Sequence, residues 1–160
     1  MTTNPVPAGY FVRTATADDL PALVALLADD ALGATRERPD ELAPYQAAFA
    51  DIEGDPHQHL VVLCATGRPE RPLGTLQLTL TPGLSHRGAT RATIEAVRVA
   101  AEARGAGLGG ALVSWAIAQA AARGCALVQL TSDASRGRVH RFYKRLGFTA
   151  SHVGFKLRLP

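Results

Sequence analysis

Short segments in which apolar side chains alternate with polar ones, or run without a break, predict six strands in this chain. The clearest alternation lies in residues 73–81, where Leu76, Leu78 and Leu80 are separated by polar residues. The last predicted strand, residues 152–159, has four apolar side chains on one face and Lys156 and Arg158 on the other. The other strands are predicted at residues 11–14, 59–65, 90–99 and 126–131, and residues 66–72 are predicted to form a loop.

Apolar residues spaced three and four positions apart predict four helices, at residues 20–30, 42–52, 108–123 and 137–146. Thr16, followed by Asp18 and Asp19, gives the first helix an N-cap signal. The helix at 108–123 carries few polar side chains and ends before Gly124, so we expect it to be buried against a sheet. Because it connects the strands at 90–99 and 126–131, those strands should be parallel neighbours. The whole pattern predicts an α/β domain.

The composition fits one compact domain over residues 1–160. Of the 160 residues 47% are hydrophobic, which is enough for a full core. A formal net charge of +3 is too small to indicate a nucleic acid partner. Cys64 and Cys125 lack the spacing of a zinc site or a disulfide framework, so we expect them to pack in the core. Because the chain shows no leader pattern and no membrane-spanning apolar run, we expect a cytoplasmic protein with no membrane partner.

The most informative stretch is the glycine-rich turn between the strand at 90–99 and the helix at 108–123. It runs from Arg104 to Gly110 and holds four glycines. Glycines let a ligand approach the backbone closely, and a helix start presents free N–H groups with a partial positive charge. A phosphate or pyrophosphate therefore fits this turn, and Arg104 adds a cation. The alternative is a turn that connects strand and helix and binds nothing.

One ligand class that matches the turn is a dinucleotide. Gly105, Gly107 and Gly110 satisfy the G-x-G-x-x-G fingerprint, and Asp133 follows about where that motif has an acid. A dinucleotide-binding fold needs several more βα units after its fingerprint, whereas only a strand, a helix and a final strand follow here. An oxidoreductase that uses nicotinamide or flavin is therefore the weaker alternative.

The other interpretation reads Arg104 to Gly109 as R-x-x-G-x-G and joins it to HRFYKRLGF at residues 140–148. With these two motifs the chain resembles the GNAT superfamily of N-acetyltransferases over nearly its whole length. The resemblance implies a mixed, mostly antiparallel central sheet with a parallel pair at the cofactor site, flanked by helices. It also implies that the turn holds the pyrophosphate of acetyl-CoA and that the central strand pairs with the pantetheine arm. The residues implied are Val97, Val99, Arg104, Gly105, Ala106, Gly107, Leu108, Gly109 and Gly110.

One position departs from the pattern of the family. Many relatives carry an asparagine that touches the cofactor where this chain has Arg136. A cation there suits a cofactor phosphate or an acidic group of the substrate. The alternative is a solvated basic face that Arg136 shares with Arg138, Arg141, Lys144 and Arg145.

Acetyl transfer to an amine requires a neutral nucleophile, although an ordinary alkylamine has a pKa of about 10.4. Glu95 is the candidate base, because counting by twos places it on the same face as Val97 and Val99. Many relatives also have a carboxylate on this strand that acts through water. The alternative is that Glu95 only pairs with Arg91 or Arg98, or binds the substrate cation.

The family motif places Tyr143 near the sulfur of acetyl-CoA, where it would protonate the departing thiolate or donate a hydrogen bond to it. Tyr143 also shares an apolar stripe with Val139, Phe142 and Leu146, so a core role is the alternative. Backbone N–H groups of the central strand near Val97 would meet the oxyanion.

In this family the first helical region and its connector usually form the acceptor wall. Asp29, Asp30, Arg36 and Glu37 lie there, and their mixed charge would suit an amine that also carries an acid group. The alternative is a solvated connector. His57 and His59 alternate at a strand entrance without a third ligand at a recognisable spacing, so we expect no metal site.

Together these features predict an enzyme that moves an acetyl group from acetyl-CoA to the primary amine of a small molecule, by direct attack in a ternary complex. The N-terminal amine of a peptide or protein is the main alternative acceptor. An acyl-CoA-binding sensor or partner module without turnover is the alternative from another class. Pairing through the last strands offers a route to a homodimer.

Overall fold

A five-stranded mixed sheet forms the centre of the molecule. The computed structural model describes residues 5–30 and 33–159. Four neighbouring strands are antiparallel, and the fifth is parallel to the fourth. In spatial order they are β1 (Tyr10–Thr14), β2 (Gln58–Ala65), β3 (Arg68–Thr81), β4 (Arg91–Val99) and β5 (Leu127–Leu130). The predicted mixed sheet with one parallel pair is therefore confirmed.

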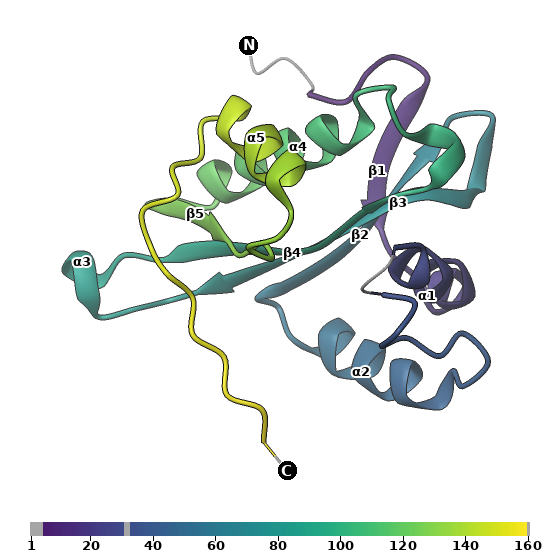
Figure 1. Ribbon diagram of the computed structural model, residues 1–160, viewed down its shortest axis with the longest axis horizontal. Coiled ribbons are helices and arrows are strands. Elements are labelled where there is room, and N and C mark those ends of the chain that lie inside the picture. Colours follow the sequence, from purple (N-terminus) through teal and green to yellow (C-terminus); the bar gives the residue numbers. More distant parts are fainter. Residues whose placement is uncertain (1–4, 31–32, 160) are drawn as a thin grey trace.

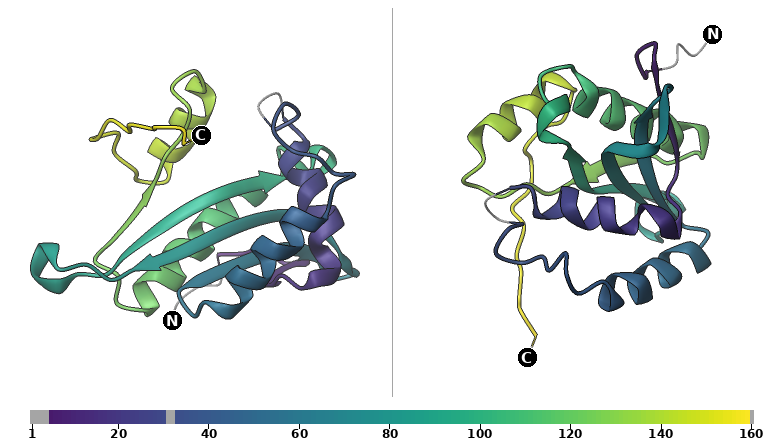
Figure 2. Two further views of the ribbon diagram at one scale, coloured as in Figure 1. Left: turned by 90° about the horizontal axis from the view of Figure 1, so that it is seen from below. Right: turned by 90° about the vertical axis from the view of Figure 1, so that its right-hand side faces the viewer.

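Helices cover both faces of the sheet (Figures 1 and 2). α4 (Leu108–Ala122) and α5 (Gly137–Arg145) lie on one face, and α1 (Leu20–Ala28) and α2 (Ala43–Gly54) lie on the other. All four correspond to helices that the apolar spacing predicts. The shorter helices are η1 (Ala17–Asp19), η2 (Ala101–Ala103) and α3 (Ser85–Gly88), the last at the tip of the hairpin between β3 and β4.

The alternation along the inner strands supplies one hydrophobic core on each face. On the α4 face, strand residues such as Leu76, Leu78 and Ile94 pack with Leu108 and Leu112. On the other face, the residues of the core are Ala15, Leu20, Leu23, Phe49, Val62 and Cys64. β2 contributes to both cores, with Val61 and Leu63 on the α4 face and Val62 and Cys64 on the other, so its register is fixed from both sides. Cys64 is fully buried and Cys125 partly buried, both as free thiols.

β3 begins earlier than predicted. The loop over residues 66–72 is wrong, because Thr66 and Gly67 alone make the turn and β3 starts at Arg68. Pro69 and Pro72 cannot donate ladder hydrogen bonds, yet this end of β3 tolerates them because β4 joins β3 only from Gly74 onward. The segment is an irregular two-stranded ribbon with β2, so its prolines signal a free edge rather than a loop.

The predicted strand at residues 152–159 is also wrong. After α5 and Gly147 the chain leaves the body as an extended segment, and every residue from 151 to 159 is exposed. Figure 1 shows this segment, in yellow, running away from the sheet toward the C-terminus. The alternation of residues 152–159 favours a strand, but a strand also needs a neighbour for its ladder, and the described part of the chain does not supply one here.

Candidate active site

The parallel pair of strands separates beside the glycine-rich turn. β5 pairs with β4 over Arg91 to Ile94, so the part of β4 from Glu95 to Val99 has no β5 partner. Two of its carbonyl groups accept hydrogen bonds from side chains: Val97 from Arg98 (3.0 Å) and Val99 from Arg104 (3.1 Å). This divergence exposes a length of strand backbone on the side where the resemblance places the pantetheine arm.

The glycine-rich turn closes one end of this gap and leads directly into α4. Gly105 and Gly107 have φ angles of 86° and 77°, in the left-handed region that favours glycine. Gly107 is the N-cap of α4, and the first intrahelical bond runs from the Ala111 N–H to its carbonyl. The N–H groups of Leu108, Gly109 and Gly110 therefore belong to the first turn, which offers donors to an anion.

The cation of the turn is held by the end of α1. Arg104 Nη2 lies 2.7 Å from Asp29 Oδ2 and also donates to the Asp29 carbonyl at 2.9 Å. Both side chains are about half exposed. The Arg104 guanidinium is thus held between the end of β4 and the end of α1, and about half of the side chain remains exposed.

A second ion-pair cluster lies on the far side of the gap. Arg136, which precedes α5, donates to Asp30 Oδ2 at 2.6 Å, and Arg98 Nη2 lies 3.4 Å from the same oxygen. Burial alone would raise the pKa of Asp30, but hydrogen bonds from Arg136 and the Gly33 N–H, with the charge of Arg98, lower it to about 2. The structure therefore brings together two residues that the sequence analysis assigned to different ligands.

Tyr143 projects from α5 toward this cluster. Its ring packs edge-on against Phe142 and Phe148, with centroids 5.0 and 5.8 Å away. Burial raises the pKa of Tyr143, and the positive charges of Arg98 and Arg136 oppose the rise. A phenol in this place remains protonated at neutral pH, which suits a proton donor. Arg98 also keeps a buried Nε that has no hydrogen-bond partner among the residues that the structure describes.

Glu95 lies on the opposite face of β4 from Val97 and Val99. Glu95 stands opposite Gln77 of β3, whereas Thr75 stands opposite Arg98, so β4 has one residue more than β3 between these pairs. That bulge contains Ala96, with φ of 54°. The period-two prediction for Glu95 is therefore wrong about the face, because the bulge resets the alternation. Glu95 is exposed and faces the α1 and α2 side, as Gln77 does.

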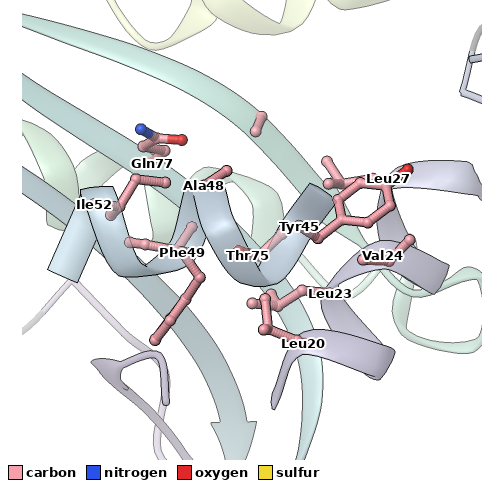
Figure 3. A pocket seen from close by; sticks show the side chains of 12 residues that line it. Leu20, Leu23, Val24, Leu27, Tyr45, Ala48, Phe49, Ile52, Thr75 and Gln77 are labelled. Carbon is pink, nitrogen blue, oxygen red and sulfur yellow. The ribbon is translucent and has the colours of Figure 1, made fainter. Parts of the chain in front are cut away.

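A cavity of about 190 Å³ opens on that same side, between α1, α2 and the sheet. Figure 3 shows side chains from both helices and from β3 converging on it. Gln77 and Ala96 form its wall next to Glu95. The sequence analysis missed these two residues and Tyr45, since apolar helix faces read as core and an alanine gives no signal of a bulge. The lining residues are Leu20, Leu23, Val24, Leu27, Tyr45, Ala48, Phe49, Ile52, Leu60, Thr75, Gln77 and Ala96.

The connector residues lie near this cavity without lining it. Glu37 Oε2 accepts a hydrogen bond from the Tyr45 hydroxyl at 2.9 Å, which ties the connector to α2. Arg36 is exposed, and its N–H donates to the Gly33 carbonyl at 2.8 Å. Glu37 is thus joined to the cavity through Tyr45.

The two histidines at the start of β2, His57 and His59, differ in their surroundings. His57 Nδ1 lies 3.2 Å from Asp55, and burial lowers the pKa of His59, with the charges of Arg123 and His57 adding to the shift. Within residues 5–30 and 33–159 no three His, Cys, Asp or Glu side chains are grouped to hold a metal ion. In the same residues no helix has the length and apolar character needed to cross a bilayer.

The dinucleotide interpretation conflicts with the sheet. A dinucleotide site needs a doubly wound parallel sheet, whereas four of these five strands run antiparallel. Asp133 accepts hydrogen bonds from the Ser135 N–H and hydroxyl, at 2.9 and 2.6 Å, and so caps a local turn. The glycine fingerprint is therefore a coincidence of spacing.

Comparisons with known proteins agree with this geometry. A solved structure called a transcriptional regulator, from Bacillus halodurans C-125, is 46% identical, with a TM-score of 0.89 over 94% of this chain and 99% of that one. A putative acetyltransferase from Agrobacterium tumefaciens str. C58 is 28% identical (TM-score 0.82, 93% and 99% covered). An acetyltransferase from Trypanosoma brucei is also 28% identical (TM-score 0.77, 94% and 99% covered). A comparison with curated proteins gives no match.

The family model described as "Acetyltransferase (GNAT) family" matches residues 20–148. This span runs from the start of α1 to the end of the HRFYKRLGF motif at residue 148, and so includes β4 and β5, the glycine-rich turn and Tyr143. The chain therefore belongs to the GNAT acetyltransferase family.

Proposed function

We propose that this protein transfers an acetyl group from acetyl-CoA to a primary amine of a small molecule, by direct attack in a ternary complex. The single observation that carries the proposal is the divergence of β4 from β5 after Ile94, between the glycine-rich turn and Tyr143. The unpaired backbone of β4, the glycine-rich turn and the phenol of Tyr143 lie along that gap. An extended donor with a pyrophosphate at one end and a thioester at the other fits this order.

The donor would lie with its pyrophosphate on the turn formed by Arg104 to Gly110. Free N–H groups at the start of α4 and the guanidinium of Arg104 would bind its charge. The pantetheine arm would pair with backbone at Val97 and Val99, and Arg136 would contribute positive charge at the other edge of the gap. Because Arg104 and Arg136 already pair with Asp29 and Asp30, each cation is held in place before the donor arrives.

Glu95 would remove the proton from the acceptor ammonium, directly or through a water molecule. The neutral nitrogen would then form the C–N bond to the thioester carbonyl as the C–S bond breaks. Tyr143 would give its proton to the departing thiolate or donate a hydrogen bond to it, and N–H groups near Val97 would bind the oxyanion. Glu95 on the cavity side of β4 and Tyr143 on α5 would thus act from two sides of the reacting carbonyl.

The acceptor would enter from the side of α1 and α2, where the cavity adjoins Glu95. A cavity of about 190 Å³ suits a small molecule better than a protein surface. Arg36 and Glu37 would lie at the rim, and Asp30 would position Arg136 and Arg98. We also propose a cytoplasmic location, on the sequence features given above.

The first experiment is calorimetric titration with acetyl-CoA, CoA and NADH, on the native chain and on Gly107→Trp. We expect micromolar binding of acetyl-CoA and CoA, lost in the variant because the indole fills the turn. If a folded native chain binds no CoA, both the transferase and the sensor without turnover are excluded.

Thiol release with a panel of amines then separates these two candidates. Release that depends on an amine establishes turnover, and the same assay with an N-terminal peptide amine tests the alternative acceptor. CoA binding without release for any amine would favour the sensor.

A further inference from the structure

The side chains that line the cavity between α1, α2 and the sheet indicate which chemical class of acceptor it would bind. No charged side chain lines it, and nine of its twelve residues are alanine, valine, leucine, isoleucine or phenylalanine. The other three are Tyr45, Thr75 and Gln77, and each already donates a hydrogen bond within the protein. Their acceptors are Glu37 (2.9 Å), the Val61 carbonyl (2.9 Å) and Gln58 (3.0 Å). A bound group would therefore meet apolar surface on nearly every side.

The size of the cavity sets the size of that group. An engineered cavity of about 150 Å³ lined by similar side chains binds benzene. At about 190 Å³ this one has room for a phenyl ring or a branched alkyl group. A polar or charged group there would lose its hydration without gaining a partner.

The position of the cavity fixes where the amine would lie. Gln77 lines the wall and stands opposite Glu95 in the sheet register, and Ala96 lines the wall next to it. We infer that the acceptor is a primary amine joined by a short chain to an apolar group of phenyl or branched-alkyl size. This inference rests on the proposed acetyl transfer, and it differs from the mixed-charge acceptor that the connector residues predict.

The test compares kcat/KM for 2-phenylethylamine, isopentylamine, ethanolamine and glucosamine in the thiol-release assay. We expect the two apolar amines to exceed the two polar ones by at least about tenfold. Ala48→Phe should remove this preference by filling the cavity, whereas Ala47→Phe, one residue away on α2 and outside the lining, should keep it.

Two outcomes would overturn the assignment, and they are distinguishable. Preferred turnover of ethanolamine or glucosamine would refute the apolar acceptor and leave acetyl transfer intact. CoA binding without thiol release for any of the four amines, and without calorimetric binding of 2-phenylethylamine, would also refute the apolar acceptor. Release with another amine of the wider panel would then leave acetyl transfer intact, whereas no release with any amine would refute both proposals.

A different observation concerns the C-terminal segment, residues 152–159. Its four apolar side chains, Val153, Phe155, Leu157 and Leu159, are 80–93% exposed, and they alternate with smaller or charged residues. Four large apolar side chains in a row along one edge form a patch that water does not favour. The pattern is that of a strand with one face buried.

The molecule also has a place where such a strand would fit. β5 is the last strand of the sheet, and its outer edge has no partner strand in the described residues. α5 extends beyond it on the α4 face, yet none of the side chains of α5 is fully buried. Phe142, Leu146 and Phe148 are only partly covered by the core. The apolar side chains of a strand added to β5 would cover these three side chains.

The geometry points to reciprocal exchange, in which residues 152–159 of one copy pair with the β5 edge of a second copy. In Figures 1 and 2 the segment leaves its own body after α5 and does not turn back to β5. Exchange of the same segment in both directions closes a two-fold dimer in which neither copy has an unpaired C-terminal segment. Apolar side chains would then lie under α5, and Lys156 and Arg158 would share a face with Gln129 of β5.

Light scattering with size exclusion gives the first test. The native chain should be a dimer, Phe155→Asp should be a monomer, and Lys156→Ser should remain a dimer. A native monomer would overturn the proposal.

Disulfide trapping then identifies the occupant of the β5 edge. In a Cys125→Ser background, Gln129→Cys is combined with Lys156→Cys or Arg158→Cys, since cross-strand neighbours lie within disulfide range. Oxidation should give a covalent dimer on a non-reducing gel, absent from each single-cysteine control. An internal disulfide in a monomer would show that each segment pairs with its own β5, and a dimer that forms no cross-link would show a different interface; either result refutes exchange.

Discussion

Arg136 Nη2 donates a 2.6 Å hydrogen bond to Asp30 Oδ2, across 106 residues of sequence. The bond joins the start of α5, which carries Tyr143, to the chain just after α1, whose side chains line the cavity. One residue earlier, Asp29 pairs with Arg104 of the glycine-rich turn. Two adjacent carboxylates thus link the end of α1 to the glycine-rich turn and to the start of α5, so the cavity and the gap between β4 and β5 are positioned as one unit.

Asp30→Asn should lower the free energy of unfolding by about 1–2 kcal/mol at neutral pH, because the pKa of Asp30 is about 2 against an ordinary value near 3.8. A carboxyl whose pKa is depressed in the folded state stabilises the fold above its unfolded pKa, and the effect disappears as pH falls through about 2. Urea unfolding at several pH values measures this. The free energies of unfolding of the two proteins should differ above pH of about 5 and converge toward pH of about 2. A difference in free energy that does not change with pH would show that the ion pair is not its source.

Arg104→Ala should weaken CoA binding by about ten- to a hundredfold, since a hydrogen bond to a charged group contributes about 1.5–3 kcal/mol. Calorimetry with CoA and with pantetheine, which lacks the pyrophosphate, distinguishes a lost contact to the pyrophosphate from damage to the rest of the donor site. Only CoA should lose affinity. Arg138→Ala, an exposed cation on α5, is the matched control, and equal losses for both ligands would place Arg104 in folding rather than in binding.

Glu95→Gln should lower kcat/KM for the amine by about a hundredfold or more while leaving CoA affinity unchanged. The defect should grow as pH falls, because less of the amine is then neutral without a base. Thiol release between pH of about 6 and 10 measures this. Glu70→Gln, an exposed carboxylate on β3, serves as control, and a Glu95→Gln variant with the native pH profile would assign Glu95 to substrate binding.

Tyr143→Phe should lower kcat by about tenfold or more with little change in thermal stability, because the ring contacts with Phe142 and Phe148 remain. An acid must be protonated to act, and burial raises the pKa of Tyr143. Activity of the native chain should therefore fall only above pH of about 10, the ordinary pKa of tyrosine, and the variant should not show this fall at high pH. Unchanged kcat with lowered stability would make Tyr143 a core residue.

Much of the fold could be predicted from local patterns. Apolar period and caps locate α1, α2, α4 and α5, and the strand, glycines and apolar helix around Arg104 predict both the parallel pair and the tight turn into α4. These features depend on residues close together in the sequence. Together with HRFYKRLGF at residues 140–148, the glycine-rich motif also indicates the family.

The parts that could not be predicted depend on distant partners or on one irregular residue. Asp29 and Asp30 pair with cations 75 and 106 residues away, which no local pattern encodes. Alanine rarely adopts a positive φ, so nothing in the sequence marks Ala96 as a bulge. Residues 152–159 have the pattern of a strand, but pattern alone does not say which edge, or which molecule, completes the ladder.

Ala96 is the one residue by which β4 exceeds β3 between Glu95 and Arg98. Deleting it would leave the faces of the strand unchanged, because Val97 would stand opposite Leu76 while Arg98 and Val99 keep Thr75 and Gly74 as partners. Flattening the bulge with every residue kept would instead shift the register by one, so that Val97 and Val99 would face α1 and Arg98 would face α4. A one-residue alignment gap at this position is therefore compatible with the same arrangement of the remaining side chains.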